Sequence, residues 1–391
     1  MTAVDTAPAT GAVDPWRTPE RIALRRLAHD VVAKEIAPHM AEWEQTGELP
    51  RELHRTVAQA GLLGVGFPEE VGGSGGDPID SAIVTEEILL GGGSTGVCAS
   101  LFTHGIAVPH IASHGSADLV DRYVRPTLAG ELIGSLGVTE PDAGSDVANL
   151  RTRAVRDGDD YVVNGAKTYI TSGVRADFVT TAVRTGDAGY GGVSLLVIDK
   201  RTAGFEVSRR LDKMGWRCSD TAELSFSDVR VPAENLVGAE NAGFLQIMQN
   251  FQTERLGLAV QAYATAARCL QLATAWARKR ETFGRPLSSR QVIRHKLAEM
   301  ARQVDVARSY TRAVMVRYLS GEDVVTEVSM AKNTAVYACD HVVNEAVQIF
   351  GGMGYMRESE VERHYRDARI LGIGGGTNEI MNEIISKRMG L

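Results

Sequence analysis

One carboxylate stands on an otherwise apolar face of an expected helix in the last third of the chain. The row it belongs to has spacings of four, three and four and consists of Ile247, Phe251, Glu254 and Leu258. Burying a carboxylate costs several kcal/mol unless it is paired or protonated. Glu254 is therefore either half of a buried ion pair, with Arg255 or another arginine, or a general base whose pKa is raised by burial.

Three consecutive glycines lie near the end of the chain, in the stretch ILGIGGGTNEIMNEII at 370–385. They precede a Thr-Asn-Glu sequence and a short apolar pattern at helical spacing. Such glycines can cradle a phosphate, let a ligand touch the backbone, or mark a place where a side chain is absent. The residue types alone leave these three explanations open.

Three further stretches carry residue types that suit a cofactor. GVTEPDAGSD at 137–146 offers hydroxyls and backbone amides, ARKRETFGRP at 277–286 offers an arginine and an aromatic ring, and QIFGGMGY at 348–355 offers paired glycines. Each stretch also has a purely structural explanation, namely a surface loop, a basic helix C-terminus and a helix cap. Taken singly, each is weak evidence of a site.

The composition argues against several classes of function. The net charge is −7 over 391 residues, with no long basic run, so nucleic-acid binding is not expected. The apolar stretches are interrupted before they reach membrane-spanning length. The 4 cysteines are scattered, which argues against zinc and fits a reducing compartment. Residues 1–16 lack the features of a targeting signal, so we expect a flexible tail and a cytoplasmic protein.

The chain divides into three parts by sequence pattern. Residues 17–132 show helical periodicity, residues 133–235 carry β-branched and aromatic runs, and residues 236–391 are helical again. Alternating β-α units are absent, and so is a strand followed by GxGxxG, which argues against a Rossmann domain. We therefore predict an α+β protein with a helical domain, a β-domain and a second helical domain.

Some individual elements can also be predicted. An Asn-Gly pair within YVVNGAKTYITSG predicts a hairpin turn at 164–165. GGVSLLVIDK and TAELSFSDVRVP are typical of strands. Long helices are expected at 241–279, 289–320 and 325–349.

Taken together and in order, six stretches resemble the acyl-CoA dehydrogenase family, and the resemblance covers essentially the whole chain. They are GVTEPDAGSDVAN, NGAKTYITSG, GFLQIMQNFQTERLGLA, RKRETFGRPL, VQIFGGMGYMRESEVERHYRDARI and GGTNEI. The resemblance implies an acyl-CoA dehydrogenase-like fold, with an N-terminal helical domain, a middle β-domain and a C-terminal four-helix bundle. It also implies a homotetramer that binds FAD between the β-domain and the C-terminal helices, across a subunit interface.

The resemblance assigns binding roles to individual residues. Those expected to contact FAD are Val138, Thr139, Ser145, Tyr169, Ile170, Thr171, Arg280, Phe283, Gln291, Gln348, Gly352, Thr377 and Glu379. Among them, Arg280 and Phe283 are expected to serve the cofactor of a neighbouring subunit. Those expected to contact the substrate are Ser145, Phe251, Arg255 and Gly376.

The resemblance also connects the lone carboxylate with the glycine loop. In many family members the catalytic base lies in an Ile-Tyr-Glu-Gly-Thr stretch, which is IGGGT here, so that Gly375 stands at the position of the base. A branch that resembles long-chain and isovaleryl enzymes takes its base from the facing helix instead, at the position of Glu254. We therefore expect Glu254 to be the general base. The N–H of Gly375 and the ribityl 2′-hydroxyl of FAD are expected to hold the thioester carbonyl.

The implied reaction is α,β-dehydrogenation of an acyl-CoA thioester to a trans-2-enoyl-CoA. The β-hydrogen leaves as hydride to flavin N5, and an electron-transferring flavoprotein takes up the electrons. Three alternatives stay open: a flavin monooxygenase or oxidase of the same fold, a dehydrogenase of carrier-protein-bound acyl groups, and a non-catalytic binding module. Acyl chain length is not specified, since Cys98 and Ala99 in the expected pocket wall are small whereas Phe102 is bulky.

Overall fold

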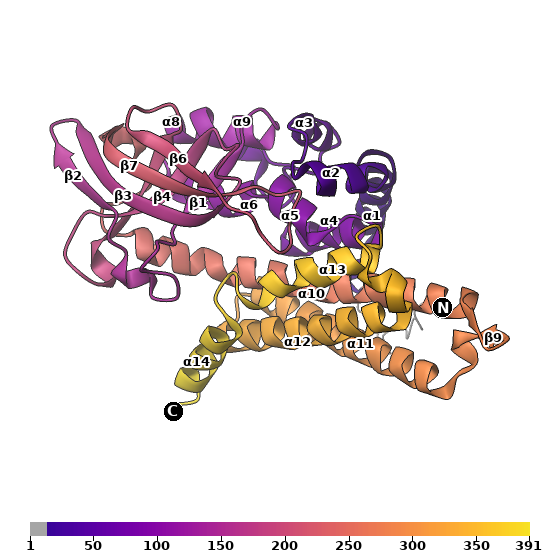
Figure 1. Cartoon of the computed structure of the whole chain (residues 1–391). Coiled ribbons are helices and arrows are strands. Elements are labelled where there is room, and N and C mark those ends of the chain that lie inside the picture. The colour runs from indigo at the N-terminus through magenta and orange to yellow at the C-terminus, as the bar shows by residue number, and fades with distance from the viewer. Residues whose placement is uncertain (1–13) are drawn as a thin grey trace.

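The computed structural model describes residues 14–391. A layer of short helices and a sheet lie on one side of a long helical bundle (Figure 1). Residues 1–13 of the predicted tail lie outside the described residues, but its last residues are folded. Pro15–Arg17 forms a 3₁₀ turn, and the buried Trp16 ring lies 4.5 Å from the guanidinium carbon of Arg312. The predicted tail therefore does not extend to Trp16, because burying an aromatic ring is favourable.

The first part of the described chain is built from short helices, as predicted. Two of them begin at strong start signals: Thr18 caps the first, and Asp77 forms a capping box with Asp80 before another. Two π-helical turns, Val32–Ile36 and Val120–Val124, continue α1 and α8. The helices are α1 (Pro19–Val31), α2 (Met40–Thr46), α3 (Glu52–Gln59), α4 (Pro78–Leu90), α5 (Thr95–Leu101), α6 (His104–Ala107), α7 (Pro109–His114), α8 (Ala117–Leu119) and α9 (Arg125–Leu128).

The middle part is a 7-stranded, mainly antiparallel sheet in the order β1-β4-β2-β3-β7-β6, with β5 paired to β4. Its strands are β1 (Gly134–Gly137), β2 (Arg153–Asp157), β3 (Asp160–Thr171), β4 (Phe178–Arg184), β5 (Val193–Asp199), β6 (Phe205–Arg210) and β7 (Thr221–Pro232). The two stretches predicted to be strands are β5 and β7. Nearly every residue of β5 is buried, which explains its continuous apolar run.

The hairpin predicted at Asn164–Gly165 is wrong, because this pair lies in the middle of β3. The chain turns earlier, where Gly158 joins β2 to β3 with a φ of 62°. At Gly165 β3 is irregular against β7, with a φ of 149°. A Cβ at Gly165 would lie 2.6 Å from the Cα of Thr152. Glycine is thus required for a close approach of two backbones, whereas the sequence pattern also fitted a turn.

The last part is a bundle of long helices, and the three predicted ones are confirmed to within two residues at every end. A small hairpin of β8 (Glu281–Thr282) and β9 (Arg285–Pro286) joins the first two. Among residues 14–391, no helix combines the length and apolar character that crossing a bilayer requires. The helices are α10 (Gly243–Lys279), α11 (Gln291–Leu319), α12 (Val325–Phe350), α13 (Glu360–Ala368) and α14 (Asn378–Arg388).

A buried carboxylate joins the first helical layer to the bundle. Glu86 of α4 accepts hydrogen bonds of 2.6 Å from Tyr263 of α10 and 2.6 Å from Arg312 of α11. Arg25 of α1 donates to its other oxygen at 3.0 Å. Although burial raises the pKa of Glu86, the two arginines and the tyrosine bring it below its ordinary value. This cluster therefore fixes α10 against α4 in the middle of its length.

Candidate functional site

Glu254 lies on α10 in the apolar row that its spacing predicted. Ile247 and Leu258 of this row are buried. Glu254 as a whole is half-buried, but its Oε2 atom is buried and has no hydrogen-bond partner among the described residues. Burial raises the pKa of Glu254 to about 6, against the opposing charges of Arg255 and Lys332. The carboxyl group is thus mostly ionised near neutral pH, with a pKa close enough to that pH to suit a general base.

The glycine loop lies directly opposite this carboxylate. A Cβ on Gly375 would lie 3.4 Å from Glu254 Oε1 and 2.4 Å from Leu258 Cδ1. Gly375 has a φ of 62° and Gly376 a φ of 91°, both in the left-handed region that side chains disfavour. Of the three explanations for the glycines, the absence of a side chain fits Gly375, since any side chain would enter the space in front of Glu254.

Two cations hold the backbone of this loop. Nε of Arg255 donates to the carbonyl of Gly375 at 3.2 Å, and Nζ of Lys332 on α12 donates to the carbonyl of Gly376. The guanidinium of Arg255 also lies 5.4 Å from the ring centroid of the half-buried Phe251. Arg255 therefore binds the loop, and its influence on the neighbouring Glu254 is through charge.

Lys332 was missed by sequence reasoning, although a signal was present. It follows Val328 and precedes Val336 by four residues each, so the three share one row of α12, and all are buried. Its own surface is 0% exposed, and burial lowers its pKa to about 8. The argument that singled out Glu254, a charge in an apolar row, applies equally to Lys332.

The loop at 137–146 is anchored by a second buried ion pair. Lys167 of β3 donates to Glu140 at 2.7 Å and to the carbonyl of Val138 at 3.1 Å. Glu140 also accepts from the backbone N–H groups of Arg151 at 2.6 Å and Thr152 at 2.9 Å. Four hydrogen bonds thus fix the start of the loop from behind. Charge-assisted bonds of this kind are strong, so the loop is held in one shape.

Six of the residues predicted to contact FAD lie on or beside this loop. Val138 is buried, Thr139 is half-buried and Ser145 is exposed. The carbonyl of Thr139 accepts from the N–H of Thr168, which brings the loop against the end of β3. That end carries Tyr169, Ile170 and Thr171.

Tyr169 is 70% exposed and has a φ of 59°. It lies where the register of β3 shifts against β7, between Lys167 and Ile170. A bulky residue in the left-handed region is uncommon and marks strain or function. An exposed aromatic ring beside hydroxyls and backbone amides fits a planar heterocycle, which can stack and form hydrogen bonds there.

Five of the other predicted FAD contacts, Arg280, Phe283, Gln291, Gln348 and Gly352, lie at the far end of the bundle. Arg280 ends α10, and its distance from Glu254 along the helix is roughly 39 Å at 1.5 Å per residue. Phe283, in the β8–β9 hairpin, is 97% exposed. Gln348 and Gly352 are exposed at the C-terminal end of α12. Figure 1 shows this hairpin at the opposite end of the bundle from the sheet. A single chain therefore does not bring the two sets of residues together.

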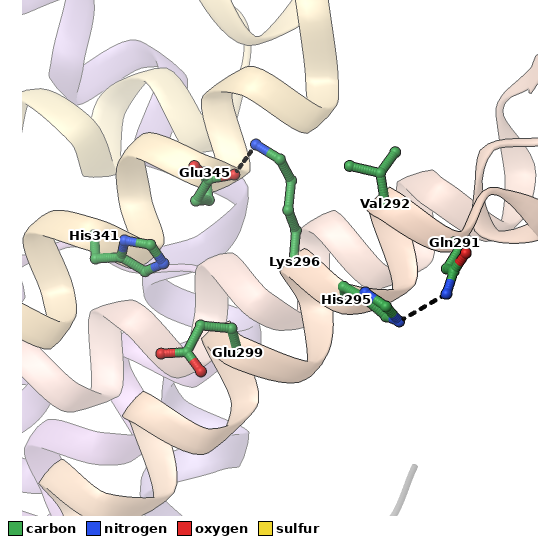
Figure 2. A pocket seen from close by; sticks show the side chains of 7 residues that line it. All are labelled: Gln291, Val292, His295, Lys296, Glu299, His341 and Glu345. Atoms are coloured by element: carbon green, nitrogen blue, oxygen red, sulfur yellow. Dashed lines mark hydrogen bonds and ion pairs between the residues drawn. The ribbon is translucent and has the colours of Figure 1, made fainter.

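A hollow of about 550 Å³ lies at this far end, between α11 and α12 (Figure 2). Its rim includes Gln291, whose amide faces His295 at 3.5 Å, and the ion pair of Lys296 with Glu345. The lining residues are Gln291, Val292, His295, Lys296, Glu299, His341 and Glu345. None of them belongs to the Glu254 site. Within residues 14–391, no group of His, Cys, Asp and Glu side chains is arranged to hold a metal ion.

The residues after the glycines have a structural role in the described chain. Oγ1 of Thr377 accepts a hydrogen bond of 3.2 Å from the N–H of Ile380 and so caps α14. Glu379 is exposed in the first turn of α14, where a negative charge suits the helix dipole. These contacts fix where the glycine loop ends.

Comparisons with known proteins cover the whole described fold. Family models described as acyl-CoA dehydrogenase N-terminal, middle and C-terminal domains match residues 18–131, 135–229 and 241–390. A solved structure of a probable acyl-CoA dehydrogenase from Mycobacterium abscessus is 80% identical, with a TM-score of 0.95, and the match covers 96% of this chain and 100% of that one.

Curated relatives agree with these matches. The long-chain specific mitochondrial acyl-CoA dehydrogenase of Sus scrofa is 38% identical over 95% of this chain and 86% of its own length. The probable acyl-CoA dehydrogenase YngJ of Bacillus subtilis is also 38% identical, over 95% of this chain and 98% of its own. The resemblance and the fold class expected from the sequence are thereby confirmed.

Glu254→Gln is expected to stabilise the fold near pH 8 and to leave its stability unchanged near pH 4. Because the pKa is about 6 in the folded chain and ordinarily 4.5, the proton stabilises the folded state. This contribution is fully present below pH 4.5 and is lost as the pH rises through about 6. The free energy of unfolding contributed by this proton therefore falls by about 2 kcal/mol between pH 4 and pH 8. Denaturant unfolding of the cofactor-free protein at both pH values measures it. Glu206→Gln, at an exposed position of β6, is the control, and an equal effect at both pH values would contradict the assignment.

Proposed function

Because the chain belongs to the acyl-CoA dehydrogenase family, we propose that Glu254 is the general base that removes the α-proton of an acyl-CoA thioester. The enzyme converts acyl-CoA to trans-2-enoyl-CoA. The observation that carries the assignment is the carboxyl group of Glu254: its Oε2 is buried with no hydrogen-bond partner among residues 14–391, and its Oε1 would lie 3.4 Å from a Cβ on Gly375. A carboxylate already paired with a cation would be a poorer proton acceptor.

The backbone of the glycine loop supplies the complementary group. We infer that the N–H of Gly375 donates to the thioester carbonyl as negative charge develops on it, in the manner of an oxyanion hole. Arg255 and Lys332 hold the loop carbonyls, so this N–H keeps its direction during the reaction. Glycine at 375 also leaves room for the α-carbon between the N–H and Glu254.

FAD is the proposed cofactor, and we place its flavin ring beside the 137–146 loop. The exposed Tyr169 next to this anchored loop supports that position. When bound, FAD supplies the acceptor for the β-hydrogen, which leaves the substrate as hydride to N5. Val138, Thr139, Ser145, Ile170 and Thr171 hold the flavin in this proposal, with Thr377 and Glu379 beyond the glycine loop. Phe251 and Gly376, with Ser145 and Arg255, are proposed to contact the substrate.

Further aspects of the function are proposed from the family resemblance. An electron-transferring flavoprotein takes up the electrons, CoA rather than a carrier protein holds the acyl group, and the protein is cytoplasmic. A monooxygenase of the same fold has no need of a base opposite the flavin, so the buried carboxylate favours α,β-dehydrogenation. An oxidase would use the same base and differs from a dehydrogenase in its reaction with O₂. Rapid reoxidation of the substrate-reduced protein by O₂, without an added acceptor, would contradict this choice.

Glu254→Gln is the direct test of the proposed function. Glutamine preserves shape but cannot accept the α-proton, so flavin reduction by acyl-CoA should slow on the order of 10²–10⁴-fold. FAD content and binding of enoyl-CoA should be unchanged, which serves as the internal control. The measurement is anaerobic stopped-flow loss of the oxidised flavin absorbance with a panel of acyl-CoA chain lengths. Near-normal reduction in the variant would assign the base to another residue.

Moving the base to Gly375 is expected to fail without a further change. In Glu254→Thr/Gly375→Glu the new Cβ meets Leu258 Cδ1 at 2.4 Å, and a left-handed residue costs about 1–2 kcal/mol. Turnover should remain near that of Glu254→Gln. Adding Leu258→Ala makes room for the new side chain and should raise turnover, with Leu258→Ala alone as the matched control. Full recovery in the double variant would show that the loop adjusts freely.

We also propose that the far set of residues serves the FAD of a neighbouring subunit in a homotetramer. Glu254 and Arg280 are separated by roughly 39 Å along α10. This separation supports the proposal, because Arg280 is too far away to bind the FAD that lies beside Glu254 of the same chain. Arg280→Ala, which removes one charge-assisted contact, should weaken FAD binding about 30-fold, or about 2 kcal/mol. Equilibrium dialysis measures the affinity for FAD, and sedimentation in parallel measures the oligomeric state. Arg278→Ala, two residues earlier on α10, is the control. A monomer that retains FAD with wild-type affinity would contradict the proposal.

A further inference from the structure

Lys332 lies in the interior without an ordinary reason for a lysine to be there. Its surface is 0% exposed, and its ammonium donates to the carbonyl of Gly376. Lysine is almost never fully buried unless its charge is compensated. The compensation here comes from a backbone carbonyl and from the attraction of Glu254, which opposes the effect of burial on the lysine pKa. A methionine would fill the same space at lower cost, so the charge itself requires an explanation.

The contact of Lys332 restrains the backbone next to the residue that faces Glu254, because Gly376 directly follows Gly375. Arg255 holds the carbonyl of Gly375 at 3.2 Å, and Lys332 holds the next carbonyl along the chain, that of Gly376. With two successive carbonyls held, the dihedral angles of these two glycines are restrained at their left-handed values. Glycines have no side chain to restrain them otherwise. The Gly375 N–H lies in the preceding peptide unit, which is joined to the held units through the φ and ψ of Gly375, so restraint of these angles limits its direction.

We propose that Lys332 is a positioning residue of the dehydrogenation, which fixes the Gly375–Gly376 backbone opposite Glu254 and supplies a positive charge that this carboxylate faces from α12. The proposal rests on the function proposed for Glu254. Lys332 does not touch the substrate in this scheme. It acts through the loop and through its charge.

The charged groups that act on Glu254 are few. Within the described chain they are Arg255 on the same helix and Lys332 on α12, while the facing loop contributes glycines. Both cations favour the ionised form of Glu254 and so offset part of the effect of burial. Burial and the repulsion of Arg255, against the attraction of Glu254, lower the pKa of Lys332 to about 8, so its charge is lost just above the physiological range. Arginine at this position would keep its charge at every working pH.

The experiment is the pH profile of anaerobic flavin reduction by a saturating acyl-CoA, between about pH 5 and about pH 9.5. The wild-type rate should rise through a pKa of about 6 and fall through a pKa of about 8. Lys332→Met should lower the maximal rate by roughly 10²-fold, because the loop is misplaced. It should also move the acid limb up by about one pH unit, since an opposite charge has been removed. Lys332→Arg should restore much of the rate and abolish the alkaline limb.

A second readout does not depend on turnover. The pH above which Glu254→Gln stabilises the cofactor-free protein reports the pKa of Glu254, and it should be higher in a Lys332→Met background. Lys387→Met removes an exposed positive charge that pairs with Glu383 on α14, and it should change neither profile. If Lys332 is purely structural, Lys332→Met lowers stability but moves neither the acid limb of flavin reduction nor the pH midpoint of the stability effect.

The outcomes separate this inference from the proposed function. If Lys332→Met keeps the wild-type rate and acid limb, the positioning role is overturned. If Lys332→Met does not fold, the alkaline limb of the pH profile decides whether Lys332 is a positioning residue. Loss of this limb in Lys332→Arg supports the positioning role, and an unchanged limb in Lys332→Arg overturns it. If no acyl-CoA reduces the wild-type flavin, or if Glu254→Gln reduces it normally, the proposed function fails. The stability midpoints still report whether Lys332 acts on Glu254.

Discussion

One buried oxygen of Glu254 has no hydrogen-bond partner among the residues that the structure describes, and this arrangement constrains everything around it. A buried and unsatisfied carboxylate costs free energy, so the surrounding structure must be stable enough to keep it in place. The apolar neighbours Ile247 and Leu258 supply packing on the same face of α10. The Glu86 cluster fixes the opposite side of that helix to α4 and α11. Stability is thus supplied by one face of α10, and the reactive group stands on another.

The glycine loop shows how a site can be built from backbone rather than side chains. Gly375 contributes an N–H and an open space, and the open space would be lost with a side chain at that position. A glycine loop is flexible unless it is held, and here two buried cations hold its carbonyls. The same cations favour the ionised form of the opposing carboxylate. Arg255 and Lys332 therefore affect both the position of the glycine loop and the ionisation of Glu254.

The β-domain uses a comparable device at a different place. The ion pair of Lys167 with Glu140 anchors the 137–146 loop on its buried side, and the hydroxyls of Thr139 and Ser145 take no part in that anchor. Tyr169 projects beside them in a left-handed conformation. In both loops the strongest polar contacts are buried and support the backbone. The side of each loop that points away from these buried contacts remains available to a ligand.

The order of the three parts, the three long helices and the row that contains Glu254 could be predicted from sequence pattern, because periodicity depends only on local geometry. It also identified the vacancy at Gly375 by resemblance. Local pattern was insufficient for Asn164–Gly165, since a glycine needed for contact with Thr152 has the same local signal as a turn. The resemblance led us to expect Glu254 opposite Gly375, and the fold shows the two facing each other. The contact of Lys332 with the same loop from α12 became visible only in the fold. These facts depend on how helices distant in sequence are packed, and packing is set by many contacts at once.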